Sequence, residues 1–434
     1  MRRTATLIVA IGISATGIGI GGAHAPQAVA QRVPPAGTKA VRFDGYAIDV
    51  PASWPVYRLD RDPARCVRYD RHAVYLGQPG GDQLCPAHLV GRVETISLAV
   101  GAQPGPPPSG PLWGPALGRA AGQPLAAGTL LQDSADHQFW GGYRHAGLTM
   151  SATYGTSPGL ITKIIRSLRW LGPPGAAVTA LPRPVQAAPA AAAAPSPALP
   201  AAPRHPIRGF DTCTVPSLRT MRVWHQVFKA MALYIGGPEA GCGFASLTAG
   251  WVSSVTAMGW ALMPTYVGLQ APCGPFAARI NKGHAEAEGR AEARNAVAIA
   301  AALGIGRGAP IYDDMEAYNS RRGICRRAVL SFLNGWTRAL HRHGYRSGVY
   351  SSAASGAEDL GLTSTVYGHR LVKPDSLWFA LWDGRANLDG RPYLLPSWWA
   401  GRHRLKQYLG GHWRRIGRIR LNIDSDLVRG AVFR

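Results

Sequence analysis

The sequence is short of acidic residues and of lysine. It has 24 acidic residues against 47 basic ones, and most of the basic residues are arginine, so the net charge is +23. A strongly basic chain is expected to have an anionic partner, such as nucleic acid, a membrane surface or an anionic cell-wall polymer. The arginines are spread along the chain, without a basic block interleaved with aromatics and without a zinc-finger or helix-turn-helix pattern. Nucleic acid is therefore not expected as a partner.

Several other signatures are also missing. The sequence contains no CxxC pair, so no metal site is predicted. It has no GxGxxG or GxxxxGK[ST] loop for a nucleotide phosphate, and no cofactor is predicted. Beyond the first 30 residues, no segment is long and apolar enough to span a bilayer, so no stable membrane span is expected.

The N-terminus has the pattern of a secretory signal peptide, which we assign to residues 1–30. Two arginines precede an apolar run, and the small-x-small sequences AHA and AVA place cleavage after Ala25 or Ala30. An uncleaved anchor and twin-arginine export are the alternatives, and the general secretory route is favoured. We therefore expect a secreted or cell-wall-associated protein.

The six cysteines lie in the exported part, where disulfides form. Cys66 and Cys85 precede the linker described below, and they are predicted to pair. Four cysteines follow the linker and are predicted to pair among themselves, with three connectivities open: Cys213, Cys242, Cys273 and Cys325.

Residues 172–206 are dominated by alanine and proline and lack acidic residues, which predicts a semi-extended linker. The linker separates residues 31–171 from residues 207–434. The first region has strand-like runs at 46–50, 72–77, 92–100 and 147–155, followed by a helical pattern over 160–171, which predicts a small α+β domain of unknown function. Its His72 and His88 are interpreted as surface or core histidines rather than ligands.

The second region alternates strands and helices. Eight strands are predicted, at 207–213, 230–237, 260–269, 309–318, 345–352, 377–383, 404–410 and 418–427, with helices at 246–258, 283–304 and 327–344. Eight strands with intervening helices predict an α/β fold, namely a (β/α)8 TIM-type barrel. No helix is evident after 377–383, so the second half is expected to be irregular. An open doubly wound sheet is the alternative.

The sequence IYDDMEAY, residues 311–318, concentrates three carboxylates at the end of the fourth predicted strand. Strand side chains alternate in direction, so Asp314 and Glu316 are expected to share one face and Asp313 to lie on the other. Positions two apart are ~6.5–7 Å apart along the backbone, within reach of the carboxyl separations that glycosidases use. Asp314 and Glu316 are therefore the predicted catalytic pair.

Other polar and aromatic residues fall at predicted strand ends. They suit a sugar-binding pocket, in which carboxylates, amides and aromatic rings meet hydroxyls and sugar faces. The predicted substrate-binding residues are Asp211, Gln270, Trp382, Gln407, Asp424 and Asp426.

The ordered motifs GFDTC, YIGG, PTYVGLQAP, IYDDMEAY, GYRSGVYSS, LWFALW, QYLGG and IDSD cover residues 207–434. This set resembles the glycoside-hydrolase-like barrel domain of secreted actinobacterial proteins, catalogued as domain of unknown function 1906. That family is distantly similar to the family 25 muramidases. The resemblance implies site roles for Asp211, Asp314, Glu316 and Asp424, with Glu316 as general acid. Asp314 would stabilise the oxocarbenium-like centre or orient an acetamido group.

Asp313 departs from the family pattern, in which an aromatic residue is expected at this position. A charge directed toward the helix layer needs a partner, and Arg294 or Arg326 is the expected one.

The sequence thus predicts a protein that hydrolyses cell-wall polysaccharide of peptidoglycan type. One alternative is a carbohydrate-binding protein that retains the fold without catalysis. Another is an interaction protein whose activity lies in residues 31–171. The predicted partner is a carbohydrate or cell-wall polymer.

Overall fold

The computed structural model describes residues 34–100, 112–115, 119–120, 123–124, 128–143, 147–171, 202–243, 246–366 and 371–434. The predicted signal peptide and residues 172–201 of the predicted linker lie outside the described residues. Pro34–Arg434 forms one compact unit. Within the described part, no helix is long and apolar enough to cross a membrane.

The described residues of the N-terminal region form two sheets and one helix. The first sheet has the order β1-β2-β12-β7-β8 and the second β3-β4-β5-β11-β10-β9-β6. The strands are β1 (Thr38–Phe43), β2 (Tyr46–Pro51), β3 (Val56–Arg58), β4 (Ala73–Leu76), β5 (Thr95–Val100), β6 (Leu112–Pro115), β7 (Arg119–Ala120), β8 (Gln123–Pro124), β9 (Gly128–Asp133), β10 (Gln138–Tyr143), β11 (Leu148–Thr153) and β12 (Arg169–Trp170). All four strands predicted in this region are present.

The helix predicted over 160–171 is shorter than expected. Helix α1 (Gly159–Arg166) buries Ile161, Ile164 and Ile165 in the core between the sheets. The hydroxyl of Ser167 donates to the carbonyl of Ile164 at 2.7 Å, and the chain then leaves the helix to form β12. Serine competes for backbone groups in this way at helix ends, which the apolar spacing alone does not reveal.

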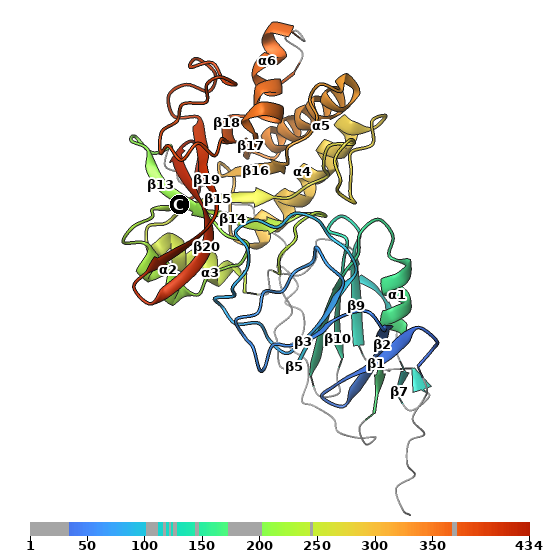
Figure 1. Ribbon diagram of the computed structural model, residues 1–434. Helices are drawn as coiled ribbons and strands as arrows, with labels where there is room; N and C mark the ends of the chain where they lie inside the picture. The colour runs from blue at the N-terminus through green and yellow to red at the C-terminus, as the bar shows by residue number, and fades with distance from the viewer. Residues whose placement is uncertain are drawn as a thin grey trace, which may run out of the picture. The chain divides into compact units, whose positions relative to one another are not determined.

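The C-terminal region forms a closed eight-stranded barrel in sequence order (Figure 1). Its strands are β13 (Ile207–Asp211), β14 (Ala230–Gly236), β15 (Ala261–Tyr266), β16 (Pro310–Met315), β17 (Arg346–Ser352), β18 (Ser376–Ala380), β19 (Arg404–Ile416) and β20 (Ile419–Arg429). All eight correspond to predicted strands. Seven neighbouring strands, β13 to β19, pair in parallel. The alternative of an open sheet is therefore wrong.

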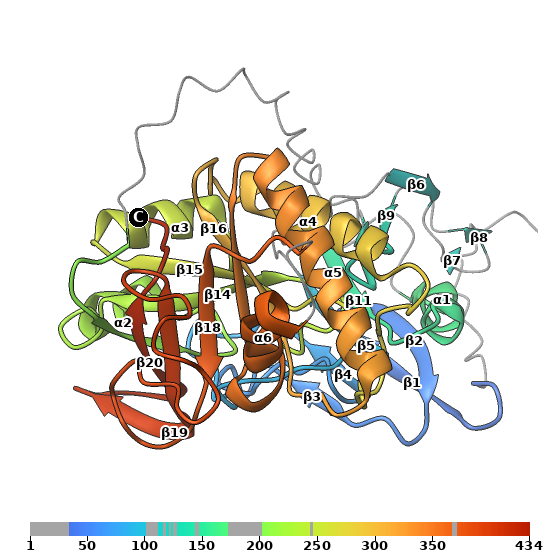
Figure 2. The same cartoon turned by 90° about the horizontal axis from the view of Figure 1, so that it is seen from above.

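The barrel lacks a complete set of helices. The helices are α2 (Leu218–Trp224), α3 (Ala249–Ala257), α4 (Ala285–Ala302), α5 (Gly323–Arg342) and α6 (Glu358–Val366), the last preceded by a π-helical turn (Ala353–Ala357). Figure 2 shows the long helices α4 and α5 side by side. The three predicted helices correspond to α3, α4 and α5, whereas α2 and α6 were not predicted.

The regular (β/α)8 repeat ends after β18. Residues 381–403 contain no helix, because proline interrupts the segment and Asp383, Asn387 and Asp389 each accept a backbone N–H two residues further on. Strand β20 then returns from β19 as a hairpin and pairs antiparallel with both β19 and β13. The mixed α/β barrel is as predicted, but the full parallel repeat is not.

The disulfides follow the predicted grouping. Cys66 pairs with Cys85, Cys213 with Cys242, and Cys273 with Cys325. All six cysteines lie in described residues, and each bridge stays on its own side of the predicted linker. Three disulfides indicate folding in an oxidising, extracytoplasmic compartment.

The N-terminal region packs on the barrel through backbone and side-chain contacts. Isolated antiparallel bridges join Arg68 to Cys242 and Val90 to Ala240. The guanidinium of Arg92 is buried and donates to the carbonyls of Ala240 and Asp136. The predicted boundary at 172–206 therefore separates two regions that contact each other directly.

Limited proteolysis is expected to cut first within residues 172–201, because an Ala/Pro sequence cannot bury a core. The two fragments should co-elute on size exclusion, since the hydrogen bond from Arg92 to Ala240 and the backbone bridges at Ala240 and Cys242 join them without the linker. They should separate in denaturant without reductant, because no disulfide joins them. A single resistant core that retains the linker would contradict this expectation.

Candidate functional site

The predicted pocket residues converge near the carboxyl ends of the parallel strands. Asp211 ends β13, Asp314 lies near the end of β16, and Gln407 lies on β19. Because β20 runs antiparallel, Asp424 is brought directly opposite Asp211, and Asp426 opposite Gln407. All five side chains are buried. The antiparallel hairpin thus still places its acids beside those of the first strand.

The predicted alternation along β16 is confirmed. The ring nitrogen Nε2 of His88 lies 2.8 Å from Glu316 Oε1 and 3.9 Å from Asp314 Oδ2, so both carboxyls face the same group. Asp313 is on the opposite face, where Gly268 and Glu292 are its neighbours. The alternation of a regular strand therefore holds through this acidic segment.

The expected ion pair of Asp313 is wrong. Both carboxyl oxygens of Asp313 are buried without a hydrogen-bond partner, and neither Arg294 nor Arg326 contacts them. Burial raises the pKa of Asp313 well above its usual value, so this side chain avoids charge by keeping its proton rather than by pairing.

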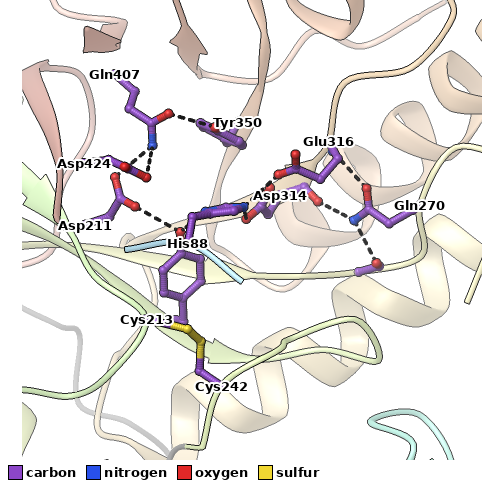
Figure 3. A network of polar contacts seen from close by, with 12 residues as sticks. His88, Asp211, Cys213, Cys242, Gln270, Asp314, Glu316, Tyr350, Gln407 and Asp424 are labelled. Atoms are coloured by element: carbon purple, nitrogen blue, oxygen red, sulfur yellow. Dashed lines mark hydrogen bonds and ion pairs between the residues drawn. A yellow bond between two sulfur atoms is a disulfide. The ribbon is translucent and has the colours of Figure 1, made fainter. Parts of the chain in front are cut away.

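His88 is a site residue that the sequence did not predict. It comes from the N-terminal region, and its ring lies among the barrel carboxyls (Figure 3). Its Nδ1 is 2.7 Å from the hydroxyl of Tyr234, which donates to Asp211 at 3.3 Å. The chain of contacts thus runs from Asp211 through Tyr234 and His88 to Glu316. No sequence motif marks His88, because it lies in the N-terminal region, far in sequence from the barrel strands that carry the other site residues.

Gln407 is the hydrogen-bonding centre of the other half of the acidic cluster. Its amide donates to Asp211 at 2.9 Å and to Asp424 at 3.2 Å. Its carbonyl oxygen accepts from the hydroxyl of Tyr350 at 3.0 Å and from the indole of Trp382 at 2.8 Å. Trp382 is 64% exposed, so one direct contact connects a solvent-facing aromatic ring to the buried acids.

Two predicted substrate-binding residues are directed to the protein itself. The amide of Gln270 donates to the carbonyls of Gly268 and Asp314, and its oxygen accepts from the backbone N–H of Glu316. Gln270 therefore holds the backbone of the carboxyl pair. Asp426 is fully buried and accepts from the indole of Trp378 at 3.0 Å.

The two predicted catalytic carboxyls differ in protonation, in the opposite sense to the expectation. Burial raises the pKa of Asp314 well above its usual value, and the negative charge of Glu316 adds to the effect. Burial alone would also raise the pKa of Glu316, but charged His88, together with hydrogen bonds from His88 and Asp314, lowers it below its usual value. Asp314 thus holds a proton while Glu316 is ionised.

The charge state of His88 follows from the same contacts. Burial would lower the pKa of its imidazole, but Glu316, Asp314 and Asp211 outweigh burial and raise the pKa well above the usual value. His88 is therefore an imidazolium that pairs with the Glu316 carboxylate, in a pocket where carboxyl groups outnumber it.

Two sets of side chains have the donor types of a divalent-cation site. The ligand atoms of His88, Asp314 and Glu316 lie within 4.8 Å of one another, as do those of His88, Asp211 and Asp424. Both sets depend on His88, and a histidine ligand must be neutral. The carboxyls around His88 favour its protonated form, so the contacts are explained by an ion pair.

Stability is expected to fall as the pH rises from about 5 to 8, since burial and neighbouring Asp211 raise the pKa of Asp424 to about 9. The folded state then keeps a proton that the unfolded state releases near its ordinary pKa of 3.8. Asp424→Asn removes this titration. It should reduce the loss of unfolding free energy between pH 5 and pH 8 by at least about 1 kcal/mol in urea denaturation. The exposed Asp62→Asn is the control, and an unchanged pH slope in Asp424→Asn would contradict the assignment.

Sequence comparison identifies a glycoside hydrolase-like domain in the barrel region. Residues 222–428 match the family described as Rv2525c-like, glycoside hydrolase-like domain. The match covers just under half of the chain, and it confirms the predicted resemblance over that stretch. It does not include His88.

Solved structures with similar folds are related only distantly. An uncharacterized B. stearothermophilus protein is 18% identical with a TM-score of 0.33, covering 51% of this chain and 95% of that one. The modular autolysin LytC from Streptococcus pneumoniae is 14% identical with a TM-score of 0.34, covering 51% and 46%. A family 25 glycosyl hydrolase from Bacillus anthracis is 11% identical with a TM-score of 0.33, covering 55% and 95%. Among curated proteins, none matches this chain significantly.

Proposed function

We propose that the protein is an exported glycoside hydrolase that cleaves a cell-wall glycan of peptidoglycan type at the acidic pocket. Its barrel would be a modified (β/α)8 fold whose last unit is a hairpin. The observation that carries this proposal is the carboxyl pair Asp314 and Glu316, in which one member is protonated and the other ionised. Glycoside cleavage needs one carboxyl in each state.

The separation of the two carboxyls argues against an inverting arrangement. Their nearest ligand atoms, with that of His88, lie within 4.8 Å of one another. Inverting glycosidases hold their carboxyls ~6.5–9.5 Å apart to admit a water molecule between them and the sugar, so this pair is too close for that arrangement. The Glu316 side chain is 23% exposed, whereas that of Asp314 is 1% exposed. Glu316 is therefore the member that a glycan meets first.

In the proposed reaction the proton passes from Asp314 through Glu316 to the glycosidic oxygen, and the bond from that oxygen to the anomeric carbon breaks. A water molecule then supplies its hydroxyl to the anomeric carbon and returns its proton to the pair. The remaining acids, Asp211 and Asp424, also lie beside His88, where they would contact the bound sugar.

The rim of the pocket has features that suit a polysaccharide. Trp382 is exposed and its ring packs on Gly410 of β19, where a Cβ would lie 2.6 Å from the ring. Further along the hairpin, Trp413 is 44% exposed and the guanidinium of Arg420 lies 4.2 Å from its ring centroid. Aromatic faces stack on sugars, and the basic hairpin would hold an anionic wall polymer.

Binding without cleavage is the second candidate. The observation that favours it is that the carboxyl pair is covered by other groups. Both oxygens of Asp314 are buried, and the His88 ring contacts both Asp314 and Glu316. A cavity of about 260 Å³ in the N-terminal region is lined by Tyr57, Arg65, Cys66, Arg68, Tyr75 and Leu84 and does not include these carboxyls.

The test is to incubate the purified mature protein with insoluble cell wall and with chitin-like oligomers, and to measure both released reducing ends and bound protein. Cleavage predicts reducing ends that accumulate with time. Binding that saturates without released ends would support the second candidate. A Trp382→Ala variant should weaken binding in either case, and its matched control is Leu395→Ala, another exposed apolar side chain.

A further inference from the structure

The segment of residues 85–92 lies against the barrel and is fixed on both sides of His88. On one side, Cys85 is tied to Cys66, and the backbone N–H of Ala87 donates to the side chain of Asn422 on β20 at 2.8 Å. On the other side, the N–H of Gly91 donates to the carbonyl of Glu239 at 2.8 Å. Because the segment is anchored on both sides of His88, the position of His88 beside the barrel carboxyls is fixed by the fold.

The imidazole is also fixed by its own contacts. Nδ1 meets the Tyr234 hydroxyl and Nε2 meets Glu316, so both ring nitrogens have partners on the barrel. With both nitrogens protonated, the ring donates to each partner, and the Tyr234 hydroxyl is left to donate to Asp211. The orientation of the Glu316 carboxylate is therefore set by a group from outside the barrel.

The groups that face His88 come from five barrel strands. Acidic neighbours are contributed by β13, β16 and β20, and tyrosines by β14 and β17: Asp211, Asp314, Glu316, Asp424, Tyr234 and Tyr350. Within the described residues, the contacts bring one basic side chain to these acids, and it is His88. The imidazolium is thus the positive charge that lies closer to Glu316 than to Asp314 and makes the two carboxyls differ in their tendency to ionise.

We propose that His88 is a positioning residue of the glycan-cleaving site, which pairs with Glu316 and fixes the orientation of its carboxylate. The proposal rests on the proposed function. Its consequence is that the working site is composite. The N-terminal region completes the site, and the glycoside hydrolase-like domain of residues 222–428 alone has an unbalanced set of acids.

The first test measures the pairing without any activity. In the full mature protein labelled with ¹⁵N-histidine, the His88 ring nitrogens should titrate well above the ordinary imidazole pKa of about 6.5, and Glu316→Gln should return their titration toward that value. The sequence has 13 histidines, so His88→Gln identifies the His88 signal, and His72→Gln, at an exposed site in the same region, should leave that signal unchanged. Ordinary titration of His88 in the wild type would overturn the proposal whatever the activity.

The second test compares pH–rate profiles for glycan release. His88→Gln removes the charge, so the acidic limb, which reports ionisation of Glu316, should move up by at least about one pH unit and the rate at pH 7 should fall about tenfold or more. Tyr234→Phe, which keeps the ring and removes the hydroxyl, should move the acidic limb of the pH–rate profile in the same direction, but by less than His88→Gln does. It serves as the second variant if His88→Gln does not fold.

The outcomes separate this proposal from the proposed function. An unchanged acidic limb of the pH–rate profile in His88→Gln would overturn the positioning role. A faster rate in His88→Gln would also overturn it, because His88 would then block the site and have to move away before the substrate binds. A wild type that neither binds nor cleaves glycan, yet shows the coupled titration of His88 and Glu316, would reject the proposed function while upholding the pairing itself.

Discussion

Glu316→Gln is expected to lower glycan release by about 10²–10⁴-fold, which is the typical contribution of a carboxyl that transfers a proton to a reacting group. The substitution keeps the size of the side chain and one of its acceptor oxygens. It removes both the negative charge that pairs with His88 and the capacity to relay the proton of Asp314. Glycan binding should be retained, because the exposed Trp382 lies on another strand connection.

Asp314→Asn is expected to be nearly as severe, because the amide cannot supply a proton although it fits the same buried site. The matched control is Asp313→Asn, which changes the neighbouring residue on the opposite face of β16. Asp313 is buried, protonated and without a hydrogen-bond partner, so this change should raise stability at neutral pH and leave the rate unchanged.

These variants are measured by reducing ends released from purified cell wall over a range of pH, with folding checked by thermal unfolding. If Glu316→Gln keeps most of the activity, the acid is misassigned and Asp211 and Asp424 are the next candidates. If Asp314→Asn is as active as the wild type, the proposed transfer of a proton from Asp314 through Glu316 is wrong even where Glu316 is essential.

The largest expected loss of stability comes from Gly335→Val, at the crossing of α4 and α5. A Cβ at Gly335 would overlap the carbonyl oxygen of Glu286, and a Cβ at Gly289 would overlap that of Phe332. The two helices thus approach through reciprocal glycines, and any side chain forces them apart. This crossing packs beside Trp336, which is fully buried.

Gly335→Val should destabilise the fold by more than about 3 kcal/mol, since it overpacks a buried contact that backbone atoms cannot relieve. Gly335→Ala should cost less, and Gly289→Ala should resemble it. The control is Gly250→Ala in α3, where a Cβ meets nothing closer than Thr248 Oγ1 at 3.8 Å and the helix gains propensity. Urea unfolding of the four variants measures their free energies of unfolding and so the order of these losses. Equal stability of Gly335→Val and the wild type would contradict the close helix approach.

Local pattern alone determined much of this protein. Each of the eight barrel strands, five to thirteen residues long, falls on a predicted strand segment, and period-two alternation placed Asp314 and Glu316 on one face and Asp313 on the other. The long helix α5 follows from its 3.6-residue spacing and its end at Gly344. The grouping of the disulfides follows from the position of the cysteines about the linker. All of these depend on interactions between residues close in sequence, or on composition.

What only the tertiary structure decided concerns groups that are distant in sequence. The direction of β20 depends on the turn after β19 and on pairing with β13, more than 200 residues earlier. Gln270 was expected to face the ligand, but its amide bonds the carbonyl of Asp314 and the N–H of Glu316, which lie 44 and 46 residues further along the chain. The protonation of the pair is opposite to that predicted because a cation 228 residues from Glu316 in sequence lies beside it. A pKa depends on burial and on neighbouring charge, and neither is encoded in the spacing of a motif.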